Sequence, residues 1–371
     1  MNLLYLQYSN PWNPHSSGGV DRVNHEIFRR LAHSHSIVVM TGYMENKPAR
    51  TLVDGVLYCQ AGTIRHKILN RAKFSMACIA VDLLPYDIVI VPWDRYAPVH
   101  IKRGTKPIVL ELHANFFEMP AKAGLLEPAI RSLLRLALKR VDYLSTVSRF
   151  LLEIPEVQRR EFHLSKVVHN GVREGLFSTP SDLKEGTYFL FMGRLDIKTK
   201  GIDTLLAAYQ HTGLDIPLLI AGDGKDKTAI ESLVNARGLR DRVSMKGWVE
   251  GHRKQELIRG CLAMCVPSRS EGFGLVAIEA MAMGRPVLGS SVEGLKEVVE
   301  DGVSGLLFEK ESIEGCASAM RRVTLDIQLR TRLMRGARER GAEFTIENTV
   351  QGKKRFLLDV IEDHSRRERE S

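Results

Sequence analysis

Two series of apolar runs of strand length, separated by stretches with a helical pattern, follow one another along the chain. In the first half the runs cover residues 3–8, 36–41, 86–91, 107–113, 143–147 and 167–169. In the second half they cover residues 188–192, 217–221, 243–246, 263–267, 286–289 and 305–308. Near-continuous apolar strands that alternate with helices are typical of parallel sheets covered on both faces. The pattern therefore predicts an α/β protein with two doubly wound domains.

A polar stretch separates the two series at residues 178–186 (STPSDLKEG). Serine, proline and glycine in such a run favour irregular backbone, so we interpret the stretch as a linker. The chain has 371 residues, of which 44% are hydrophobic, and this is enough to bury two ordinary cores. Length and pattern thus predict the same division.

The most informative local sequence is EGFGLVAIE at residues 271–279. An apolar run of strand length precedes it, and apolar residues with good helix propensity follow its middle, so Glu271 and Glu279 straddle a strand-to-helix junction. Gly272 and Gly274 have no Cβ, which lets their amides approach a ligand closely at the positive end of the helix dipole. The segment predicts an anion-binding turn flanked by two carboxylates.

The spacing of these carboxylates argues against a glycosidase. Eight residues on one continuous helix would separate their backbones by about 12 Å. Retaining glycosidases hold their two carboxyl groups ~5 Å apart and inverting ones about 6.5–9.5 Å apart. A division of labour fits better, in which one carboxylate accepts hydrogen bonds from ribose hydroxyls, the other meets a sugar, and glycine amides hold the diphosphate. Two solvated glutamates on an amphipathic helix remain the simpler alternative for the motif by itself.

The motif resembles the signature of the retaining GT-B glycosyltransferases of family 4, E-G-F-G-L-x-x-x-E, and matches it at every specified position. Other segments match this family in the expected order: Gly193-Arg194, Lys200-Gly201, Ala221 to Gly224 (AGDG), Gly247-Trp248 and Asn170-Gly171-Val172. The resemblance covers nearly the whole chain, and it is weaker in the N-terminal half, where such enzymes recognise diverse acceptors.

The resemblance implies a GT-B fold, with two facing Rossmann-like domains and a last helix that crosses back to the first. It places an acceptor-binding domain at residues 1–180 and a nucleotide-sugar-binding domain at residues 181–345. Residues 346–371 would form the helix that packs back on the N-terminal domain, spanning 346–362, and a charged frayed tail from Arg366.

Residues at strand ends are the candidates for chemistry, because ligands bind beyond the carboxyl ends of strands in doubly wound sheets. Gly18 and Gly19 precede a helix predicted to begin near Val20, and their amides could face a phosphate. Arg194 and Lys200 follow the first strand of the second domain. Fixed cations there can neutralise the charge that grows on a leaving diphosphate, in place of a metal, although solvated surface cations are the alternative.

The resemblance adds a role to each candidate. It implies that Glu279 holds the ribose, that Glu271 and His113 orient the sugar, and that the backbone at Trp248 and Val249 borders the base. The expected catalytic residues are Glu271, His113, Arg194 and Lys200. The expected donor-binding residues are Gly18, Gly19, Arg194, Lys200, Gly222, Trp248, Val249, Glu271, Gly272, Phe273, Gly274, Leu275 and Glu279.

Other cofactor chemistries lack support in the sequence. A G-x-G-x-x-G motif is missing after the first strand, and Gly222-Asp223-Gly224 continues as Lys225-Asp226-Lys227, which argues against a nicotinamide dehydrogenase. No Asp-x-Asp triplet occurs, and no His, Cys and carboxylate cluster has metal-ligand spacing. We expect no cofactor and no metal.

Charge is distributed unevenly along the chain. Residues 1–180 hold 23 Lys and Arg against 15 Asp and Glu, while residues 181–371 hold 30 against 29. The basic half is compatible with anionic membrane lipid, a lipid-linked diphosphate acceptor or nucleic acid. Residues 64–76 (IRHKILNRAKFSM) predict a basic amphipathic helix, for which a plain solvated surface helix is the alternative. No aromatic-basic motif supports nucleic acid, so we expect none.

The N-terminus has no signal-peptide pattern, and no run of eighteen apolar residues occurs. The five cysteines are scattered, and we interpret them as reduced core residues. We therefore expect a cytoplasmic protein that can associate peripherally with the inner face of the membrane.

The expected activity is retaining transfer of a sugar from a nucleoside-diphosphate donor, with UDP- or GDP-sugars favoured. The acceptor would be a glycan, a lipid-linked intermediate or a small molecule, and cell-envelope polysaccharide or glycolipid synthesis would be the setting. Two alternatives stay open: a sugar-nucleotide epimerase or hydrolase of GT-B fold, and a non-catalytic sugar-nucleotide-binding protein. The sequence identifies neither the base, the sugar nor the acceptor.

Overall fold

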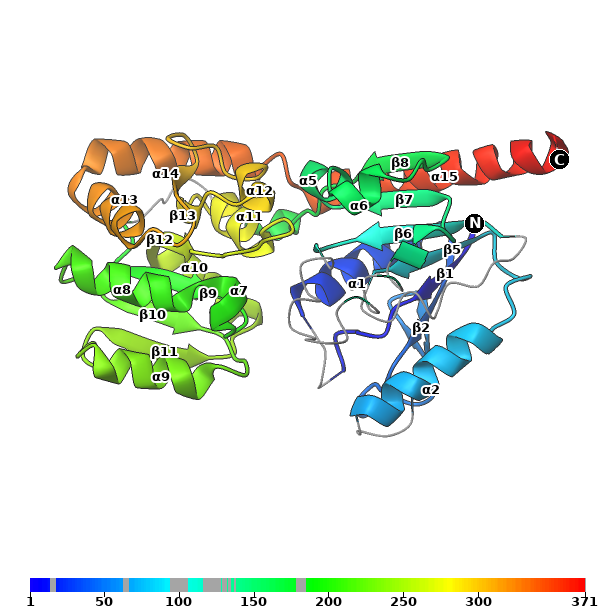
Figure 1. Ribbon diagram of the computed structural model, residues 1–371, viewed down its shortest axis with the longest axis horizontal. Coiled ribbons are helices and arrows are strands. Elements are labelled where there is room, and N and C mark those ends of the chain that lie inside the picture. Colours follow the sequence, from blue (N-terminus) through cyan, green and yellow to red (C-terminus); the bar gives the residue numbers. More distant parts are fainter. Residues whose placement is uncertain are drawn as a thin grey trace. The chain divides into compact units, whose positions relative to one another are not determined.

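The chain divides into two compact units, Met1–Asn170 with Ile346–Ser371, and Gly171–Thr345. We call them the N-terminal and the C-terminal unit. The computed structural model describes residues 1–13, 18–62, 67–93, 106–115, 138–177 and 185–370, with single positions 128, 132, 135 and 136. Residues 178–184 of the expected linker lie outside the described residues. Each unit contains one sheet with helices packed on it (Figure 1).

The C-terminal unit is built on a six-stranded sheet in which every strand pair is parallel. Its strands are β9 (Tyr188–Met192), β10 (Leu218–Ala221), β11 (Val243–Gly247), β12 (Cys261–Val266), β13 (Val287–Ser290) and β14 (Gly305–Phe308). The strand order is β11-β10-β9-β12-β13-β14, so the order reverses between β9 and β12. Such a switch point opens a crevice at the carboxyl ends of the two strands.

Helices cover this sheet and fill its core. They are α7 (Ile197–Lys200), α8 (Ile202–Thr212), α9 (Lys227–Ala236), α10 (Gly251–Gly260), α11 (Leu275–Ala282), α12 (Glu293–Lys296), α13 (Ile313–Leu325) and α14 (Ile327–Gly341), after the 3-10 turn η4 (Glu174–Leu176). Leu205 of α8 and Met320 of α13 pack with Ile220 of β10 in one fully buried cluster. Ser312 and Asp326 begin α13 and α14 by accepting hydrogen bonds from backbone amides, as N-cap residues do.

The N-terminal unit has an eight-stranded sheet in the order β3-β4-β2-β1-β5-β6-β7-β8. Its strands are β1 (Asn2–Leu6), β2 (Ser36–Thr41), β3 (Arg50–Val53), β4 (Val56–Gln60), β5 (Ile88–Pro92), β6 (Ile108–Leu112), β7 (Tyr143–Thr146) and β8 (Leu164–Val167). All pairs are parallel except β3 with β4, which is antiparallel. The sequence pattern predicted β1, β2, β5, β6, β7 and β8, and it placed the last of these a few residues too far toward the C-terminus.

The hairpin β3–β4 was missed, although the sequence carries a signal for it. Asp54-Gly55 joins the two strands, and both residues have positive φ, at 50° and 79°. Asp-Gly with this backbone is typical of the two-residue turn that connects antiparallel strands. The strands were overlooked because β3 alternates between exposed and half-buried residues and lacks a continuous apolar run.

Among the described residues, the named helices of the N-terminal unit are α1 (Gly19–Leu31), α2 (Lys67–Ala80), α5 (Arg149–Leu152), α6 (Pro155–Gln158) and α15 (Ile346–Glu370). Helix α15 follows the C-terminal unit in the chain, yet Val350, Leu357 and Val360 pack in the core that contains Tyr5 and Phe28. The expected last helix that packs back on the first domain is therefore confirmed (Figure 1).

The expectation that the chain frays from Arg366 is wrong for the residues described, because α15 continues to Glu370. Arg366 and Arg367 lie one turn beyond Asp363 and pair with its two carboxylate oxygens at 2.6 and 2.8 Å. The Tyr143 hydroxyl donates a hydrogen bond of 3.0 Å to the same carboxylate. Ion pairs three and four residues apart stabilise a helix, and the contact with β7 ties this end to the sheet.

Candidate functional site

The loops that follow β9 and β12 meet at the switch point of the C-terminal unit. Lys200 ends α7 after β9, and its Nζ lies 2.7 Å from Oε2 of Glu271, which follows β12. The Ser268 hydroxyl donates a second hydrogen bond of 3.1 Å to the same oxygen. Two residues predicted as catalytic are thus joined by a half-buried ion pair.

Helix α7 is held in place by carboxylates at its start. Asp196 is its N-cap residue and accepts a hydrogen bond of 3.2 Å from the Thr199 amide, while the Ile197 amide donates to Asp226 at 2.8 Å. At the other end Gly201 has a φ of 62°, and a Cβ there would lie 2.1 Å from the carbonyl oxygen of Pro267. Glycine is required because it permits both this left-handed backbone and the close approach to the loop after β12.

The turn that contains Glu271 packs against the backbone of α12. A Cβ at Gly294 would lie 2.1 Å from the Glu271 carbonyl oxygen and 2.7 Å from the carbonyl carbon of Gly272. Gly274, with a φ of 96°, is the N-cap residue of α11, and Leu275 is the first residue of that helix. The first amides of α11 therefore lie directly after the Glu271 turn, as the sequence predicted. Phe273 anchors the turn, because its buried ring packs edge-on against Phe344.

Glu279 of α11 also has a lysine partner. Nζ of Lys254, on α10, lies 2.6 Å from Oε1 of Glu279. Trp248 and Val249 follow β11, and the Trp248 indole, half exposed, donates its N–H to Glu250. Sequence reasoning missed Lys254, since nothing in its local sequence distinguishes it from other surface lysines.

The loop after β10 packs against the loop after β9. Gly222 has a φ of 152°, and a Cβ there would lie 1.8 Å from the carbonyl oxygen of Gly193, directly before Arg194. The Arg194 side chain is exposed. Behind the site, Arg269 donates two hydrogen bonds to Asp203 of α8, at 2.9 and 2.8 Å, and tethers the loop after β12 to the helix after β9.

The remaining predicted residues lie in the N-terminal unit. The Gly18 amide donates a hydrogen bond of 2.7 Å to Asp21, and Gly19 is the first residue of α1. His113 directly follows β6, and its Nε2 lies 3.7 Å from Oε2 of Glu111. The structure therefore groups the predicted donor-binding residues of the C-terminal unit at the carboxyl ends of its strands. Gly18, Gly19 and His113 belong to the N-terminal unit.

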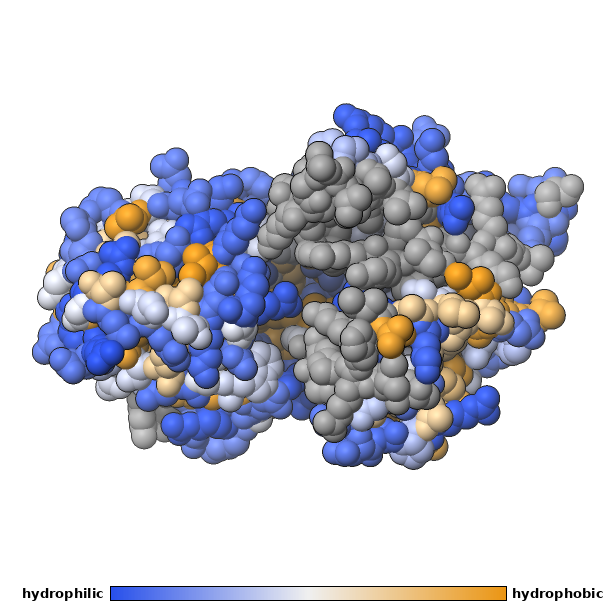
Figure 2. Space-filling model, turned by 60° about the horizontal axis from the view of Figure 1, so that its bottom comes forward, coloured by the Kyte–Doolittle hydropathy of each residue, from blue (hydrophilic) through white to orange (hydrophobic). Residues whose placement is uncertain are grey.

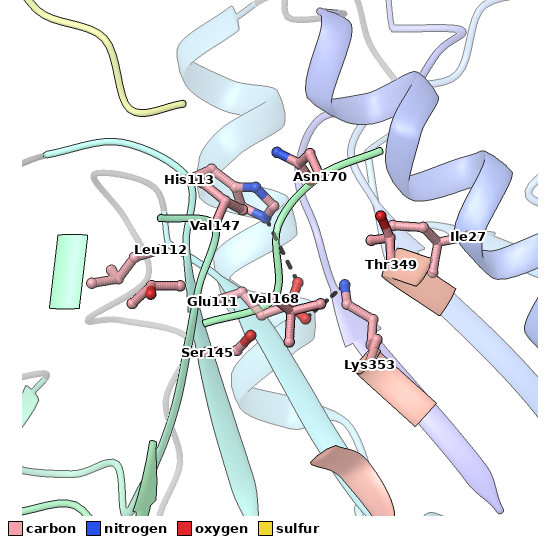
Figure 3. A pocket seen from close by; sticks show the side chains of 11 residues that line it. Ile27, Glu111, Leu112, His113, Ser145, Val147, Val168, Asn170, Thr349 and Lys353 are labelled. Carbon is pink, nitrogen blue, oxygen red and sulfur yellow. Dashed lines mark ion pairs between the residues drawn. The ribbon is translucent and has the colours of Figure 1, made fainter. Parts of the chain in front are cut away.

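A small buried cavity of about 10 Å³ lies beside His113. Figure 3 shows Glu111 between His113 and Lys353, and Lys353 Nζ lies 2.8 Å from Oε1 of Glu111. Burial alone would raise the pKa of the Glu111 carboxyl, but Lys353 and then His113 outweigh burial and lower this pKa to about 2. Glu111 is thus ionised at neutral pH. A glutamate inside the apolar strand IVLEL was the sequence signal for this cluster, and it was overlooked.

In the part of the chain that the structure describes, no group of three or more His, Cys, Asp and Glu side chains is arranged to hold a metal ion. None of the helices described there is long and apolar enough to span a membrane.

Comparison with known proteins identifies similar sequences. Residues 177–340 match the family described as glycosyl transferases group 1. An uncharacterized glycosyltransferase of Methanocaldococcus jannaschii is 30% identical over 349 residues, which cover 92% of this chain and 95% of that protein. A D-inositol 3-phosphate glycosyltransferase of Xylanimonas cellulosilytica is 34% identical, but the match covers only 48% of this chain and 42% of that protein. The chain thus spans less than half of that second relative.

Comparison with solved structures identifies the fold. Sucrose-phosphate synthase from Thermosynechococcus elongatus superimposes with a TM-score of 0.81 at 20% identity, over 97% of this chain and 99% of that one. Anabaena HepE, in a complex with UDP-glucose, superimposes with a TM-score of 0.77 at 19% identity, over 97% of this chain and 100% of that one. Together with the two parallel sheets and the long C-terminal helix, these similarities confirm the predicted GT-B fold.

Gly294 provides a test of how tightly the Glu271 turn is packed. We expect Gly294→Ala to destabilise the protein by about 1–3 kcal/mol, the usual cost of overpacking, because the new methyl group meets backbone that cannot rotate away. Guanidinium unfolding followed by tryptophan fluorescence measures the change. The matched control is Gly175→Ala, where a Cβ would meet no described atom within 4 Å. Equal stability of the two variants would show that the turn is not constrained in this way.

Proposed function

The chain belongs to the glycosyl transferases group 1 family, whose members are glycosyltransferases that use nucleotide-sugar donors, and we propose a specific division of labour for its site. In this proposal the protein moves a sugar from a nucleoside-diphosphate donor to an acceptor hydroxyl, with retention of anomeric configuration. The donor binds to the C-terminal unit. The acceptor is a glycan, a lipid-linked intermediate or a small molecule, and cell-envelope polysaccharide or glycolipid synthesis is the proposed setting.

One observation carries the proposal, namely the ion pair of 2.7 Å between Lys200 and Glu271 at the switch point between β9 and β12. The pair places a cation and a carboxylate directly before the first amides of α11. A helix N-terminus attracts phosphate, and an adjacent lysine adds a full positive charge. A sugar nucleotide has both groups that such a site would select, a diphosphate and a hydroxyl-rich sugar.

Each side chain has a proposed role that follows from its chemistry. Lys200, Arg194 and the amides of the turn from Gly272 to Leu275 hold the diphosphate. Glu279, which lies 2.6 Å from Lys254, accepts hydrogen bonds from the ribose hydroxyls. Glu271 orients the sugar, and from the family resemblance we assign His113 a second sugar contact. Gly222, Trp248 and Val249 border the nucleoside. Gly19, the first residue of α1, offers its backbone amide to a phosphate, whereas the expected Gly18 amide donates to Asp21 instead.

The proposed reaction needs no metal and no other cofactor. As the bond from the sugar to the diphosphate breaks, negative charge grows on the departing phosphate oxygen, and the Arg194 and Lys200 cations stabilise it. The acceptor hydroxyl attacks from the same face, and the departing oxygen takes its proton. Preorganised charge of this kind is usually a large part of enzymatic rate enhancement.

The structural similarity to Anabaena HepE, which has been solved with UDP-glucose, supports UDP-sugars as the first donors to test. GDP-sugars are the next candidates. A sugar-nucleotide epimerase or hydrolase of the same fold differs in needing no acceptor, and a non-catalytic binder differs in giving no product. These alternatives predict distinct outcomes with the same reagents.

The proposal is tested by mixing the protein with UDP-, GDP-, ADP- and dTDP-sugars and following binding and products by mass spectrometry. We expect one base to bind preferentially, and we expect the free nucleoside diphosphate to accumulate only when an acceptor pool is added. Product from the donor alone would favour the epimerase or hydrolase. Binding without turnover under any condition would favour the non-catalytic protein, and binding of none of the donors would contradict the whole proposal.

Removing either proposed diphosphate cation tests the catalytic assignment. We expect Arg194→Ala and Lys200→Ala each to lower kcat by ~100-fold or more, the usual loss when one stabilising donor is removed. Lys198→Ala is the matched control, because Lys198 is exposed on the same short helix and has no assigned role. Steady-state kinetics at saturating donor measures the effect. Near-normal turnover in both site variants would refute the assignment.

We further propose that the protein is cytoplasmic and docks peripherally on anionic membrane through α2. Residues 64–66 of the predicted basic helix lie outside the described residues, and the described helix begins at Lys67. Leu69, Met76 and Ile79 lie on its exposed face, 54%, 69% and 47% exposed, while Phe74 packs inward against Tyr8. Figure 2 shows hydrophobic residues, in orange, among the blue hydrophilic residues on the face of the molecule that it draws. Exposed apolar side chains on a basic helix are typical of interfacial docking.

Vesicle binding tests this proposal. We expect sedimentation with phosphatidylglycerol vesicles at low salt and much weaker sedimentation with phosphatidylcholine vesicles. The double substitution Met76→Gln with Ile79→Gln should weaken binding roughly tenfold or more, because burying each apolar side chain stabilises by about 1.5 kcal/mol or more. Leu325→Gln is the control, since Leu325 is 71% exposed in the C-terminal unit. Unchanged binding of the double variant would exclude α2 as the docking surface.

A further inference from the structure

Three ionisable side chains form a row inside the N-terminal unit, from Lys353 through Glu111 to His113 (Figure 3). The Lys353 and Glu111 side chains are 6% and 4% exposed, and the two charged groups lie 2.8 Å apart. His113 is 10% exposed, and its Nε2 lies 3.7 Å from the second oxygen of Glu111. The row therefore leads from the buried face of α15 to the carboxyl end of β6.

The row contains buried polar atoms that lack hydrogen bonds. Among the described residues, Oε2 of Glu111 and both ring nitrogens of His113 have no hydrogen-bond partner. Such atoms are costly to leave unpaired. The adjacent cavity of about 10 Å³ is close to the smallest volume that holds a water molecule. The atoms that remain unpaired thus point to a contact that is completed by a water, by a small rotation of the imidazole or by a bound sugar.

Stability alone does not account for the pair of Lys353 and Glu111. Removing two charges from water is costly, and well-packed apolar residues of similar volume usually hold a fold at least as well. Lys353 occupies a position in the apolar stripe of α15, between Val350 and Leu357, where a leucine would suit the core. A function would explain the charged pair if the Glu111 carboxylate acts on a neighbouring residue. His113 is the neighbour that this carboxylate faces.

We propose that Glu111, paired with Lys353 at 2.8 Å, is a positioning residue that sets the tautomer and orientation of His113. An ionised carboxylate only accepts hydrogen bonds, so it selects the imidazole form with the proton on Nε2. Nδ1 then carries a lone pair, which can accept a hydrogen bond from a sugar hydroxyl. This inference rests on the proposed function, in which His113 contacts the transferred sugar.

The surroundings contain few other charges that could produce the same effect. Tyr5 of β1 faces Glu111, and Lys353 lies 5.6 Å from the centre of its ring. Burial and then the charge of Glu111 raise the pKa of the Tyr5 hydroxyl well above its usual value, so Tyr5 stays neutral. The other elements that line the cavity supply uncharged side chains: Ile27, Leu112, Ser145, Thr146, Val147, Val168, Asn170 and Thr349. Within the described residues, Glu111 is therefore the negative charge that acts on His113.

The test uses the full-length protein with ¹⁵N-labelled histidine, in which NMR distinguishes the two tautomers directly. His113→Gln identifies the signal of His113 by its disappearance. We expect a single Nε2–H tautomer in the unsubstituted protein and a mixture of tautomers in the double variant Glu111→Gln with Lys353→Met, which leaves no unpaired buried charge. Lys353→Arg keeps the cation and should keep the single tautomer. Arg355→Met, on the exposed side of α15, is the control.

Kinetics provide an independent measurement. The double variant should lower kcat roughly tenfold or more, as when the outer partner of an oriented histidine is removed, while KM for the donor stays within about twofold. In a His113→Ala background the same double substitution should cause no further loss, because its effect passes through His113.

An unchanged tautomer in the double variant, or a full loss of kcat that persists in the His113→Ala background, would overturn the inference. A protein that turns over no donor would instead contradict the proposed function. The tautomer measurement needs no substrate, so it tests the role of Glu111 separately from that outcome.

Discussion

Close approach of backbone to backbone at the carboxyl ends of the parallel strands is the constraint on which the C-terminal unit depends. Gly201 lies against Pro267, Gly222 against Gly193, and Gly294 against the Glu271 turn, with room for no Cβ at any of the three. Parallel strands deliver their following loops to one edge of the sheet, and glycine lets these loops pack without side chains between them. Residues far apart in the chain are thereby brought within hydrogen-bond distance.

The charges at this edge are paired before any donor binds. Both motif glutamates have lysine partners, at 2.7 Å for Glu271 and at 2.6 Å for Glu279. In the proposed function, the lysines keep the negative donor from meeting unscreened negative charge. In the proposed reaction, a bound diphosphate competes with Glu271 for Lys200, so binding rearranges an existing ion pair. Within the described residues, the exposed Arg194 side chain has no ion pair to break, so in this proposal it can turn toward the diphosphate directly.

Helix α15 shows how the order of the chain and the order of the fold differ. It follows the C-terminal unit in sequence but completes the core of the N-terminal unit, through Val350, Leu357 and Val360. It also brings Lys353 to Glu111. Glu111 lies near the end of β6, two residues before His113. The last segment of the chain therefore supplies both packing and charge to the sheet that the first segment forms.

The sequence by itself determined most of the strands and the site motif, because these depend on local patterns. Apolar runs indicated the parallel strands other than β4, and glycines around Glu271 indicated a turn before a helix, where α11 begins. The partners of the glutamates were decided by tertiary structure. Lys200 and Glu271 are 71 residues apart, and any of 53 basic side chains could have been the partner until the strand order set which loops meet. The length of α15 was likewise decided by contacts, since Asp363 pairs with Arg366 and Arg367 and accepts a hydrogen bond from Tyr143 of β7, which lies far away in sequence.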